Sequence, residues 1–464
     1  MEHLANTMTE LYTGSCAQSP ETDVHNTDSD IGVCTGYQVS KECTSEMMMK
    51  SYRYKQLVST DPDSTFESSC FKSSIAAGGL SSKDTPYSMS KCDVIDGCTR
   101  AYAINVYGED TTMHVKYSKE GSPTLFVMGV FDGHGNNAHV SRAVACAYND
   151  YFAEHYDNIT MLPFTDHGSF KSLLHKMCAT VEDAISPDVT RGGGSTATIV
   201  GVVENGAKRI VFNMNMGDSH AYMRRNTVTQ QISVDHSVDN KDAYTEYCAI
   251  NLERGIKPAP AVYNRINCDK LGSAINGVRN HEGKIEPIPI FDVTEDGKVS
   301  FNIKARDYIT KYTEPGGVQS IRQYVGIVNG VTTVLPGYEH INHGSTLMGD
   351  LQFVRGHGDL KQTQDHGFLH IHDINIYSVE PEDTVDIVCG SDGLWDLFWT
   401  CEIMDVIDDT AELSVRNIKK LIVERSQVGK FAKKGYRTLV IGLHIKAQWD
   451  DVSFVSFVSP PLSS

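Results

Sequence analysis

The order of hydrophobic and polar positions along the chain predicts strands and helices in separate blocks. Residues 124–131 form a short continuous apolar run that ends in Asp132-Gly133, which is typical of a buried strand. Apolar residues recur at four-residue steps from 140 to 152, and a second periodic pattern covers about 168–186. Both patterns predict helices that bury one face.

Strand patterns return after these helices, and a second strand block is again followed by helices. The expected strands are 196–203, 209–216, 221–224, 384–389 and 452–458, and the later helices lie near 399–408 and 412–426. The short turns between the strands of the first block indicate antiparallel pairing. Strand blocks followed by helices favour an α+β fold over alternating βα units.

Two stretches lack these patterns. Residues 1–92 are rich in Ser and Thr and poor in aliphatic residues, which predicts a mostly disordered leader. Residues 237–343 contain several Pro and Gly turns, so we expect irregular structure with occasional hairpins there. The pattern thus predicts a folded domain over 93–460 that contains an irregular stretch at about 237–343.

Composition and charge narrow the class of protein. The chain has 464 residues, of which 41 are basic and 59 acidic, and its formal net charge is −18. A hydrophobic fraction of 40% is enough for a sizeable core. The negative charge argues against nucleic acid and anionic membranes as partners, whereas acidic residues gathered at one site would favour divalent cations.

The sequence also favours a reducing, intracellular compartment, in the cytoplasm or the nucleus. No run is long and apolar enough to span a membrane, and the first residues lack the basic and apolar regions of a signal peptide. Twelve cysteines are scattered along the chain, and Cys92 and Cys98 have neither zinc nor redox spacing.

Acidic residues next to glycine recur at the predicted ends of strands. The segments are Asp132-Gly133-His134-Gly135, Gly217-Asp218-Ser219, Gly349-Asp350 and Ser391-Asp392-Gly393-Leu394-Trp395-Asp396, and the pair Asp450-Asp451 adds a fifth. A single Asp-Gly is usually a turn. Several carboxylates that converge form a site for Mg²⁺ or Mn²⁺, and two such ions can activate a water for attack on phosphorus.

The order of these segments resembles that of the metal-dependent protein phosphatases of type 2C. The matching segments, in chain order, are Glu109-Asp110, Asp132 to Gly135, Gly194-Ser195-Thr196-Ala197, Gly217-Asp218-Ser219-His220, Asp235-His236, Gly349-Asp350, Ser391 to Asp396, and Asp450-Asp451-Val452-Ser453. The resemblance covers about residues 98–458. It implies a four-layer α-β-β-α sandwich of two antiparallel sheets flanked by helices.

The resemblance also implies roles for individual residues. Asp132 would bridge two Mg²⁺ or Mn²⁺ ions, and Gly133 would ligate through its carbonyl. The remaining ligands would be Glu109, Asp392 and Asp450, with Asp218 and Asp396 at a third ion. His134 would be the general acid that protonates the leaving oxygen of serine or threonine, or else a loop histidine held by a hydrogen bond.

Some positions depart from the family pattern. Asn105 stands where an arginine is expected to hold the substrate phosphate, and Arg100 is the alternative cation for that role. His220 and Asp451 replace an Arg and an Asn. Residues 344–348 replace the Ser-Arg-x-x that precedes Gly-Asp. The segment between His236 and Gly349 is longer than the family needs, so the resemblance implies an insertion at about 237–343.

Two further patterns have structural explanations beside functional ones. The segment from Asp292 resembles the start of a calcium-binding loop, but Ile303 stands where the twelfth position needs Glu. We therefore expect a hairpin between Phe291 and 299–301. A third of the histidines lie in 340–372, at His340, His343, His357, His366, His370 and His372. They could bind zinc, but alternation on one strand face is the favoured reading.

These observations lead to three functional hypotheses. The favoured one is a monomeric protein serine/threonine phosphatase that acts in signalling on phosphoprotein substrates, using a metal-bridged hydroxide. The second is a pseudophosphatase that keeps the fold as a regulatory binding module, which Asn105 and the insertion would allow. The third keeps the chemistry but takes a small phosphoester.

Overall fold

The computed structural model describes the greater part of the predicted domain. The described residues are 65–67, 73–80, 87–95, 97–135, 138–161, 166–185, 193–206, 208–238, 240–263, 265–266, 274–275, 278–279, 285–286, 289–302, 325–328, 331–334, 345–347, 351–395, 398, 400–428 and 451–461. All of them belong to one compact unit, Cys43–Ser464. Most of the predicted leader lies outside the described residues.

One sheet has seven antiparallel strands in the order β24-β10-β9-β6-β5-β4-β3. Its strands are β3 (Tyr87–Ile95), β4 (Cys98–Tyr107), β5 (Asp110–Ser118), β6 (Thr124–Phe131), β9 (Ala197–Asn205), β10 (Lys208–Met216) and β24 (Asp373–Val379). The meander predicted over 196–224 is confirmed only in part, because β9 pairs with β10 but the third expected strand, 221–224, belongs to the other large sheet.

The other large sheet has six antiparallel strands in the order β1-β2-β26-β25-β11-β12. They are β1 (Thr65–Glu67), β2 (Ser74–Leu80), β11 (His220–Arg225), β12 (Val228–Gln231), β25 (Val385–Gly390) and β26 (Val452–Ser459). β2 and β26, which are far apart in the sequence, therefore pair in the interior of this sheet.

The two sheets pack face to face over a shared apolar core. Val200 and Val211 of the seven-stranded sheet are buried together with Ile387 and Val455 of the six-stranded sheet. Phe126 and Phe457 meet edge to face across the interface, with ring centroids 5.3 Å apart. Sheets buried on both faces need continuous apolar strands, which explains why β6 is an unbroken apolar run.

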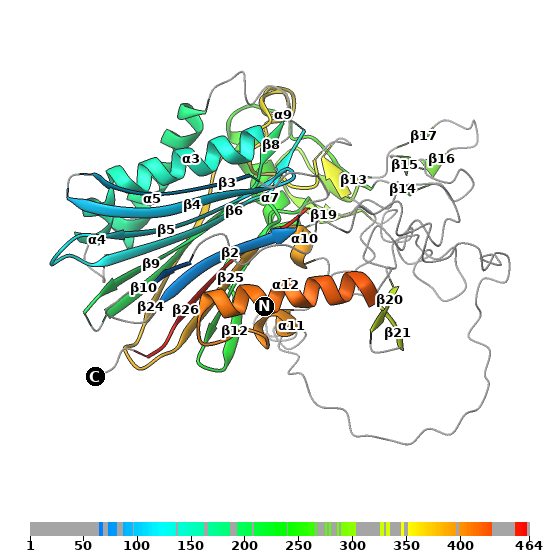
Figure 1. Ribbon diagram of the computed structural model, residues 1–464. Helices are drawn as coiled ribbons and strands as arrows, with labels where there is room; N and C mark the ends of the chain where they lie inside the picture. The colour runs from blue at the N-terminus through cyan, green and yellow to red at the C-terminus, as the bar shows by residue number, and fades with distance from the viewer. Residues whose placement is uncertain are drawn as a thin grey trace. The chain divides into compact units, whose positions relative to one another are not determined.

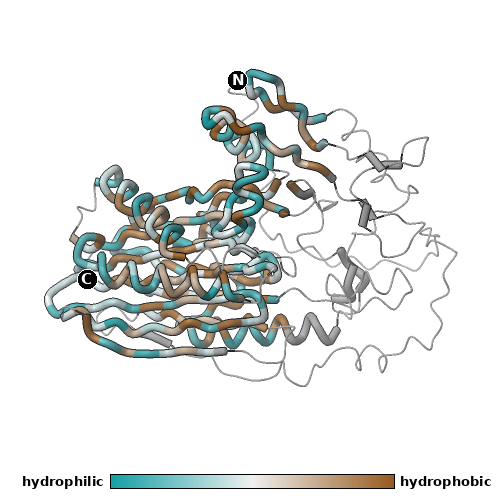
Figure 2. Tube along the Cα trace, turned by 90° about the horizontal axis from the view of Figure 1, so that it is seen from above, coloured by the Kyte–Doolittle hydropathy of each residue, from teal (hydrophilic) through white to brown (hydrophobic). Residues whose placement is uncertain are grey.

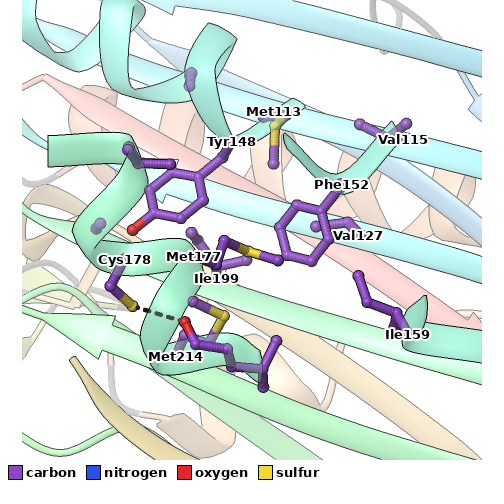
Figure 3. Packing of buried hydrophobic residues seen from close by; sticks show 14 of the residues in the cluster. Met113, Val115, Val127, Tyr148, Phe152, Ile159, Met177, Cys178, Ile199 and Met214 are labelled. Carbon is purple, nitrogen blue, oxygen red and sulfur yellow. Dashed lines mark hydrogen bonds between the residues drawn. The ribbon is translucent and has the colours of Figure 1, made fainter. Parts of the chain in front are cut away.

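Helices cover the outer face of each sheet, as Figure 1 shows. The seven-stranded sheet is covered by α3 (His139–Glu154), α4 (Tyr156–Met161) and α5 (His167–Ala184). Figure 3 shows Tyr148 and Phe152 of this layer packed among Met113, Val127 and Met214 of the strands. Asp166 begins α5 by accepting a hydrogen bond from the Ser169 N–H at 3.0 Å, a typical helix N-cap.

The six-stranded sheet is covered by α10 (Asp392–Trp395), α11 (Thr400–Met404) and α12 (Ala411–Val428). Val415 and Ile418 of α12 are buried against Ala76 and Phe454 of the sheet. The four-layer α-β-β-α sandwich is thus confirmed. In Figure 2 the helices carry both hydrophilic and hydrophobic residues, as expected for helices that bury one face.

The predicted leader boundary at residue 92 is wrong, because β2 and β3 lie before it. β2 is a buried central strand, yet its sequence is short and rich in Ala and Gly, so it lacks an aliphatic signal. A Cβ on Gly78 would lie 2.8 Å from Phe454 and Val415, and one on Gly79 would lie 2.6 Å from the Val452 carbonyl. Close packing, not hydrophobicity, selects these residues.

The predicted insertion contains one well-packed part. There α7 (Lys241–Glu253) packs on the hairpin of β18 (Phe291–Val293) and β19 (Val299–Phe301), and Tyr244 stacks on Phe291 with centroids 4.9 Å apart. The hairpin predicted there is confirmed. The other strand pairs described in this region are β13 (Ala261–Tyr263) with β22 (Ser345–Leu347), β14 (Arg265–Ile266) with β15 (Ala274–Ile275), β16 (Val278–Arg279) with β17 (Ile285–Glu286), and β20 (Val325–Val328) with β21 (Val331–Val334).

A small three-stranded sheet has the strand order β23-β8-β7. Its strands are β7 (Gly133–His134), β8 (Gly194–Ser195) and β23 (His357–Gly358), and α9 (Leu360–His366) follows β23. Within the described residues, no helix is long and apolar enough to cross a membrane.

Replacing Phe457 with Ala tests the packing of the two sheets. We expect Phe457→Ala to lower the free energy of unfolding by about 3–5 kcal/mol, because the ring is fully buried between the sheets. Urea unfolding of the full chain measures this change. The control is Val228→Ala at a position that is 65% exposed, which should change stability by less than about 0.5 kcal/mol. Equal effects would contradict the sandwich core.

Candidate functional site

The turn between β4 and β5 carries Glu109 and contacts the start of β26. The Glu109 N–H donates to Asp451 Oδ2 at 2.8 Å. Gly108 has a φ of 73°, and a Cβ there would lie 1.8 Å from Asp451 Oδ2, so the position requires glycine. The hydrogen bond ties an end of the seven-stranded sheet to an end of the six-stranded sheet.

Asp132 and Gly133 follow β6 and lie beside this turn. The Asp132 N–H donates to Thr196 Oγ1 at 3.0 Å, and the Thr196 N–H donates to the Asp132 carbonyl at 2.9 Å. A Cβ on Gly133 would lie 2.3 Å from the Glu109 carbonyl. The backbone of Gly133 therefore approaches that of Glu109 as closely as only glycine permits.

Asp392 begins α10 directly after β25, and hydrogen bonds tie this corner to β26. The Ser391 N–H donates to the Ser453 carbonyl at 3.0 Å, and the Ser453 N–H donates to Ser391 Oγ at 3.1 Å. The Trp395 Nε1–H donates to the His220 carbonyl at 3.2 Å. Asp392 is thereby held next to the segment that begins with Asp451.

Asp218 lies between β10 and β11, near the same corner. Its neighbour Ser219 shares a hydrogen bond with Thr196, with 2.9 Å between Oγ and Oγ1. A Cβ on Gly217 would lie 2.5 Å from the Thr196 side chain. Thr196 thus links the Asp132 and Asp218 segments.

The structure therefore brings together the segments of four predicted metal ligands, Glu109, Asp132, Gly133 and Asp392, and places Asp218 near them. Three other predicted positions, Asp350, Asp396 and Asp450, lie outside the described residues. Within the described residues, no group of three or more His, Cys, Asp or Glu side chains is arranged to hold a metal ion. The donors are carboxylates and a carbonyl, which fit Mg²⁺ or Mn²⁺ in chemistry.

His134 lies on β7 beside these segments and pairs with a carboxylate that the sequence analysis did not assign. Its Nε2 lies 2.9 Å from both Oδ1 and Oδ2 of Asp359. The His134 side chain is 30% exposed, whereas that of Asp359 is 3% exposed. Phe353 meets the imidazole edge to face at 5.6 Å.

Asp359 corrects the alignment of one motif. The type 2C pattern Ser-Arg-x-x-Gly-Asp is met by Val354-Arg355-Gly356-His357-Gly358-Asp359, in which only the Ser is replaced. Gly349-Asp350, the segment matched to this motif from the sequence, has Thr346 in place of the Arg and lies outside the described residues. An Arg four residues before Asp was the signal that would have found the correct segment.

The residues considered for phosphate binding do not form a cationic clamp. Asn105 is 1% exposed and accepts a hydrogen bond from Ser88 Oγ at 2.7 Å. Arg100 is engaged elsewhere, because Nε and Nη2 donate to the Asp93 carboxylate at 2.9 and 2.7 Å and Nη1 donates to Asp150 at 2.8 Å. This bidentate pair lowers the pKa of Asp93 to about 2.

The position of Arg100 along β4 also argues against a role in binding the substrate phosphate. Arg100 pairs with Tyr117, whereas Tyr107 at the other end of the strand pairs with Asp110. Nine residues of extended chain separate Arg100 from Glu109, which is about 30 Å. Arg100 is therefore a structural residue and not the cation that holds the substrate phosphate.

Three described members of the histidine-rich segment, His357, His370 and His372, are held by side-chain hydrogen bonds. His357 lies with Nδ1 2.5 Å from Glu182 Oε2 and Nε2 3.1 Å from the Tyr148 hydroxyl, which in turn lies 2.6 Å from His372 Nε2. Burial lowers the pKa of His357, and Glu182 opposes that shift. The zinc alternative gains no support from these residues, while His340 and His343 lie outside the described part.

Comparison with known proteins gives matches in structure but not in sequence. No model of a known protein family matches the chain. No curated protein matches it either.

Among solved structures, the chain is similar to a serine-threonine phosphatase 2C from Toxoplasma gondii, at 14% identity and a TM-score of 0.41, over 81% of this chain and 100% of that one. It is similar to a C. elegans sex determining protein, at 16% identity and a TM-score of 0.41, over 81% of this chain and 65% of that one. A serine/threonine phosphatase from Staphylococcus aureus matches at 14% identity and a TM-score of 0.37, over 82% and 96%.

The order of the motifs in the sequence resembles that of the type 2C, or PPM-type, phosphatases. Because the TM-scores lie below 0.5, function is inferred below from the residues of this chain alone.

Asp451→Asn tests the tie between the two sheets. The Asn side chain keeps an oxygen that can accept the Glu109 N–H, so we expect a change in unfolding free energy of less than about 1 kcal/mol. Asp451→Ala leaves that N–H without its acceptor and should cost about 1–3 kcal/mol. Urea unfolding compares the two variants, and equal stability for both would contradict the role of the bond.

Asp93→Asn tests the structural role of Arg100. Because the pKa of Asp93 is lowered on folding, its ion pair stabilises the fold above about pH 4 and is lost as the pH falls toward about 2. The wild type should therefore lose more stability than Asp93→Asn across that window. Parallel stability curves, from thermal unfolding at each pH, would contradict the pairing.

Proposed function

We propose that this protein is a divergent type 2C phosphatase that hydrolyses phosphoserine and phosphothreonine esters with two Mg²⁺ or Mn²⁺ ions. The supporting observation is the junction of Glu109, Asp132-Gly133 and Asp392, which is tied by the hydrogen bond from the Glu109 N–H to Asp451. These segments come from both sheets and are far apart in sequence.

The donor set indicates which residues would hold the ions. Asp132, the Gly133 carbonyl and Glu109 would contribute on one side, Asp392 and Asp450 on the other, and Asp218 and Asp396 at a third position. When bound, such ions lower the pKa of a water that attacks phosphorus. Without cations, carboxylates gathered in this way would repel each other.

His134 would supply the proton to the leaving oxygen of serine or threonine. Its ring is partly exposed beside Gly133, so it can face a substrate next to the proposed ions. Asn105 occupies the position of the expected arginine and is neutral and buried, so it would offer no charge to the phosphate.

The neutral Asn105 is also the observation that favours the second candidate, a pseudophosphatase acting as a regulatory binding module. A small phosphoester substrate remains the third candidate, because a lost cationic clamp weakens selection for a phosphoprotein. Phosphoproteins as partners, a monomeric state, a role in signalling and an intracellular location complete the proposal.

The test is hydrolysis of a phosphothreonine peptide by the full chain with Mn²⁺. We expect activity that a chelator removes and that Asp392→Asn lowers by at least about 100-fold, because a ligand carboxylate is lost. The matched control is Asp386→Asn on β25, the strand that precedes Asp392, where the Asp386 carboxylate pairs with Arg224 at 2.8 Å.

The control variant should retain activity within about threefold of the wild type. A wild type that shows no Mn²⁺-dependent hydrolysis would contradict the enzyme and favour the binding module. Hydrolysis of small phosphoesters without hydrolysis of the peptide would favour the third candidate.

A further inference from the structure

Asp359 is held against His134 by a backbone conformation that few residues adopt. Its φ is 52°, in the left-handed region, although it is not glycine. Non-glycine residues in that region are uncommon and often lie at functional sites, where the surrounding structure holds the strain. In this conformation the Asp359 carboxylate lies beside the His134 imidazole, with both of its oxygens 2.9 Å from Nε2.

Neighbouring segments fix this conformation. The Asp359 N–H donates to the Gly193 carbonyl at 3.0 Å, and the Gly358 N–H donates to Glu182 Oε1 at 3.4 Å. A Cβ on Gly194 would lie 2.0 Å from Asp359 Oδ2, so glycine at 194 makes room for the carboxylate. These contacts hold the buried Asp359 carboxylate beside His134.

A second His–Asp pair in the same molecule shows what a purely structural pair looks like. His236 Nε2 lies 2.7 Å from Asp373 Oδ2, and the Gly217 N–H donates to His236 Nδ1 at 3.2 Å. Both ring nitrogens are therefore used, and the His236 side chain is fully buried. His134 differs because only its Nε2 bonds to a described residue, and its ring is 30% exposed.

We propose that Asp359 is a positioning residue that holds His134 through Nε2–H, so that Nδ1 is the nitrogen that gives its proton to the leaving oxygen. The proposal rests on the proposed phosphatase function. It assigns Asp359 a role that resembles the orienting carboxylate of other acid–base histidines.

The proton balance of the step is as follows. As water forms the new bond to phosphorus it releases one proton to solvent, and as the bond from phosphorus to the serine or threonine oxygen breaks, that oxygen takes the proton from Nδ1. The ring is left neutral with its remaining proton on Nε2, where Asp359 accepts the hydrogen bond. Nδ1 then regains a proton from solvent, so the products are the free hydroxyl group and inorganic phosphate.

The experiment compares two substrates in full-length wild type, Asp359→Asn and Asp359→Gly with Mn²⁺. A phosphothreonine peptide has a poor alkoxide leaving group and needs an acid, whereas p-nitrophenyl phosphate has a good leaving group and does not. We expect kcat on the peptide to fall about 100-fold in Asp359→Gly and by less in Asp359→Asn, whose amide oxygen can still accept a hydrogen bond from Nε2–H, and kcat on the aryl ester to fall less than about threefold in both.

The two variants separate chemistry from folding. Asn tolerates a positive φ and keeps the size of the side chain, and Gly relieves the strain while removing the carboxylate. Asp359→Gly therefore keeps the test valid if Asp359→Asn folds poorly. The matched control is Asp373→Asn at the second His–Asp pair, which should change both substrates by the same factor.

The outcomes distinguish the positioning role from the proposed function. A selective loss on the peptide supports the role. Equal losses on both substrates, or no loss on the peptide, would overturn the role and leave the phosphatase function intact. A wild type inactive on both substrates would overturn the function and the role together.

Discussion

The hydrogen bond between the Glu109 N–H and Asp451 joins the two sheets at the corner where the chemistry is proposed. Each sheet alone holds only some of the proposed metal ligands. Glu109 and Asp132 adjoin strands of the seven-stranded sheet, and Asp392 follows a strand of the six-stranded sheet. Gly108 and Gly133 make the approach possible, because any side chain at either position would collide with its neighbour. The site therefore depends on how closely the sheet edges meet.

Most of the fold follows from hydrophobic patterning, but its exceptions share a physical cause. The helices over 140–152 and 168–186 and the buried strand over 124–131 were predicted from periodicity and correspond to α3, α5 and β6. β2 was missed because close contact with α12 and β26 selects Gly and Ala, which carry no aliphatic signal. Packing of this kind exists only in three dimensions, so no local pattern reports it.

The candidate site was predictable where motifs are short and continuous. Glu109, Asp132 and Asp392 were assigned from their neighbours, and the structure brings their segments together. Asp359 was missed because its Gly-Asp competed with Gly349-Asp350 for the same motif, although Arg355, four residues before Asp359, distinguishes the two segments and the contact with His134 supports that choice. Arg100 is the opposite case. Its charge suggested that it could bind the substrate phosphate, but its bidentate bond with Asp93 excludes that role.

The net charge of −18 has part of its explanation at this corner, where two divalent cations would offset about four negative charges. The most direct measurement of the account is a calorimetric titration of Mn²⁺ into the metal-free full chain and into Asp132→Asn. The account predicts saturable binding to the wild type with a Kd of about 1 mM or tighter, and weakening of at least about tenfold in the variant. No binding to the wild type, or equal binding to both proteins, would contradict it.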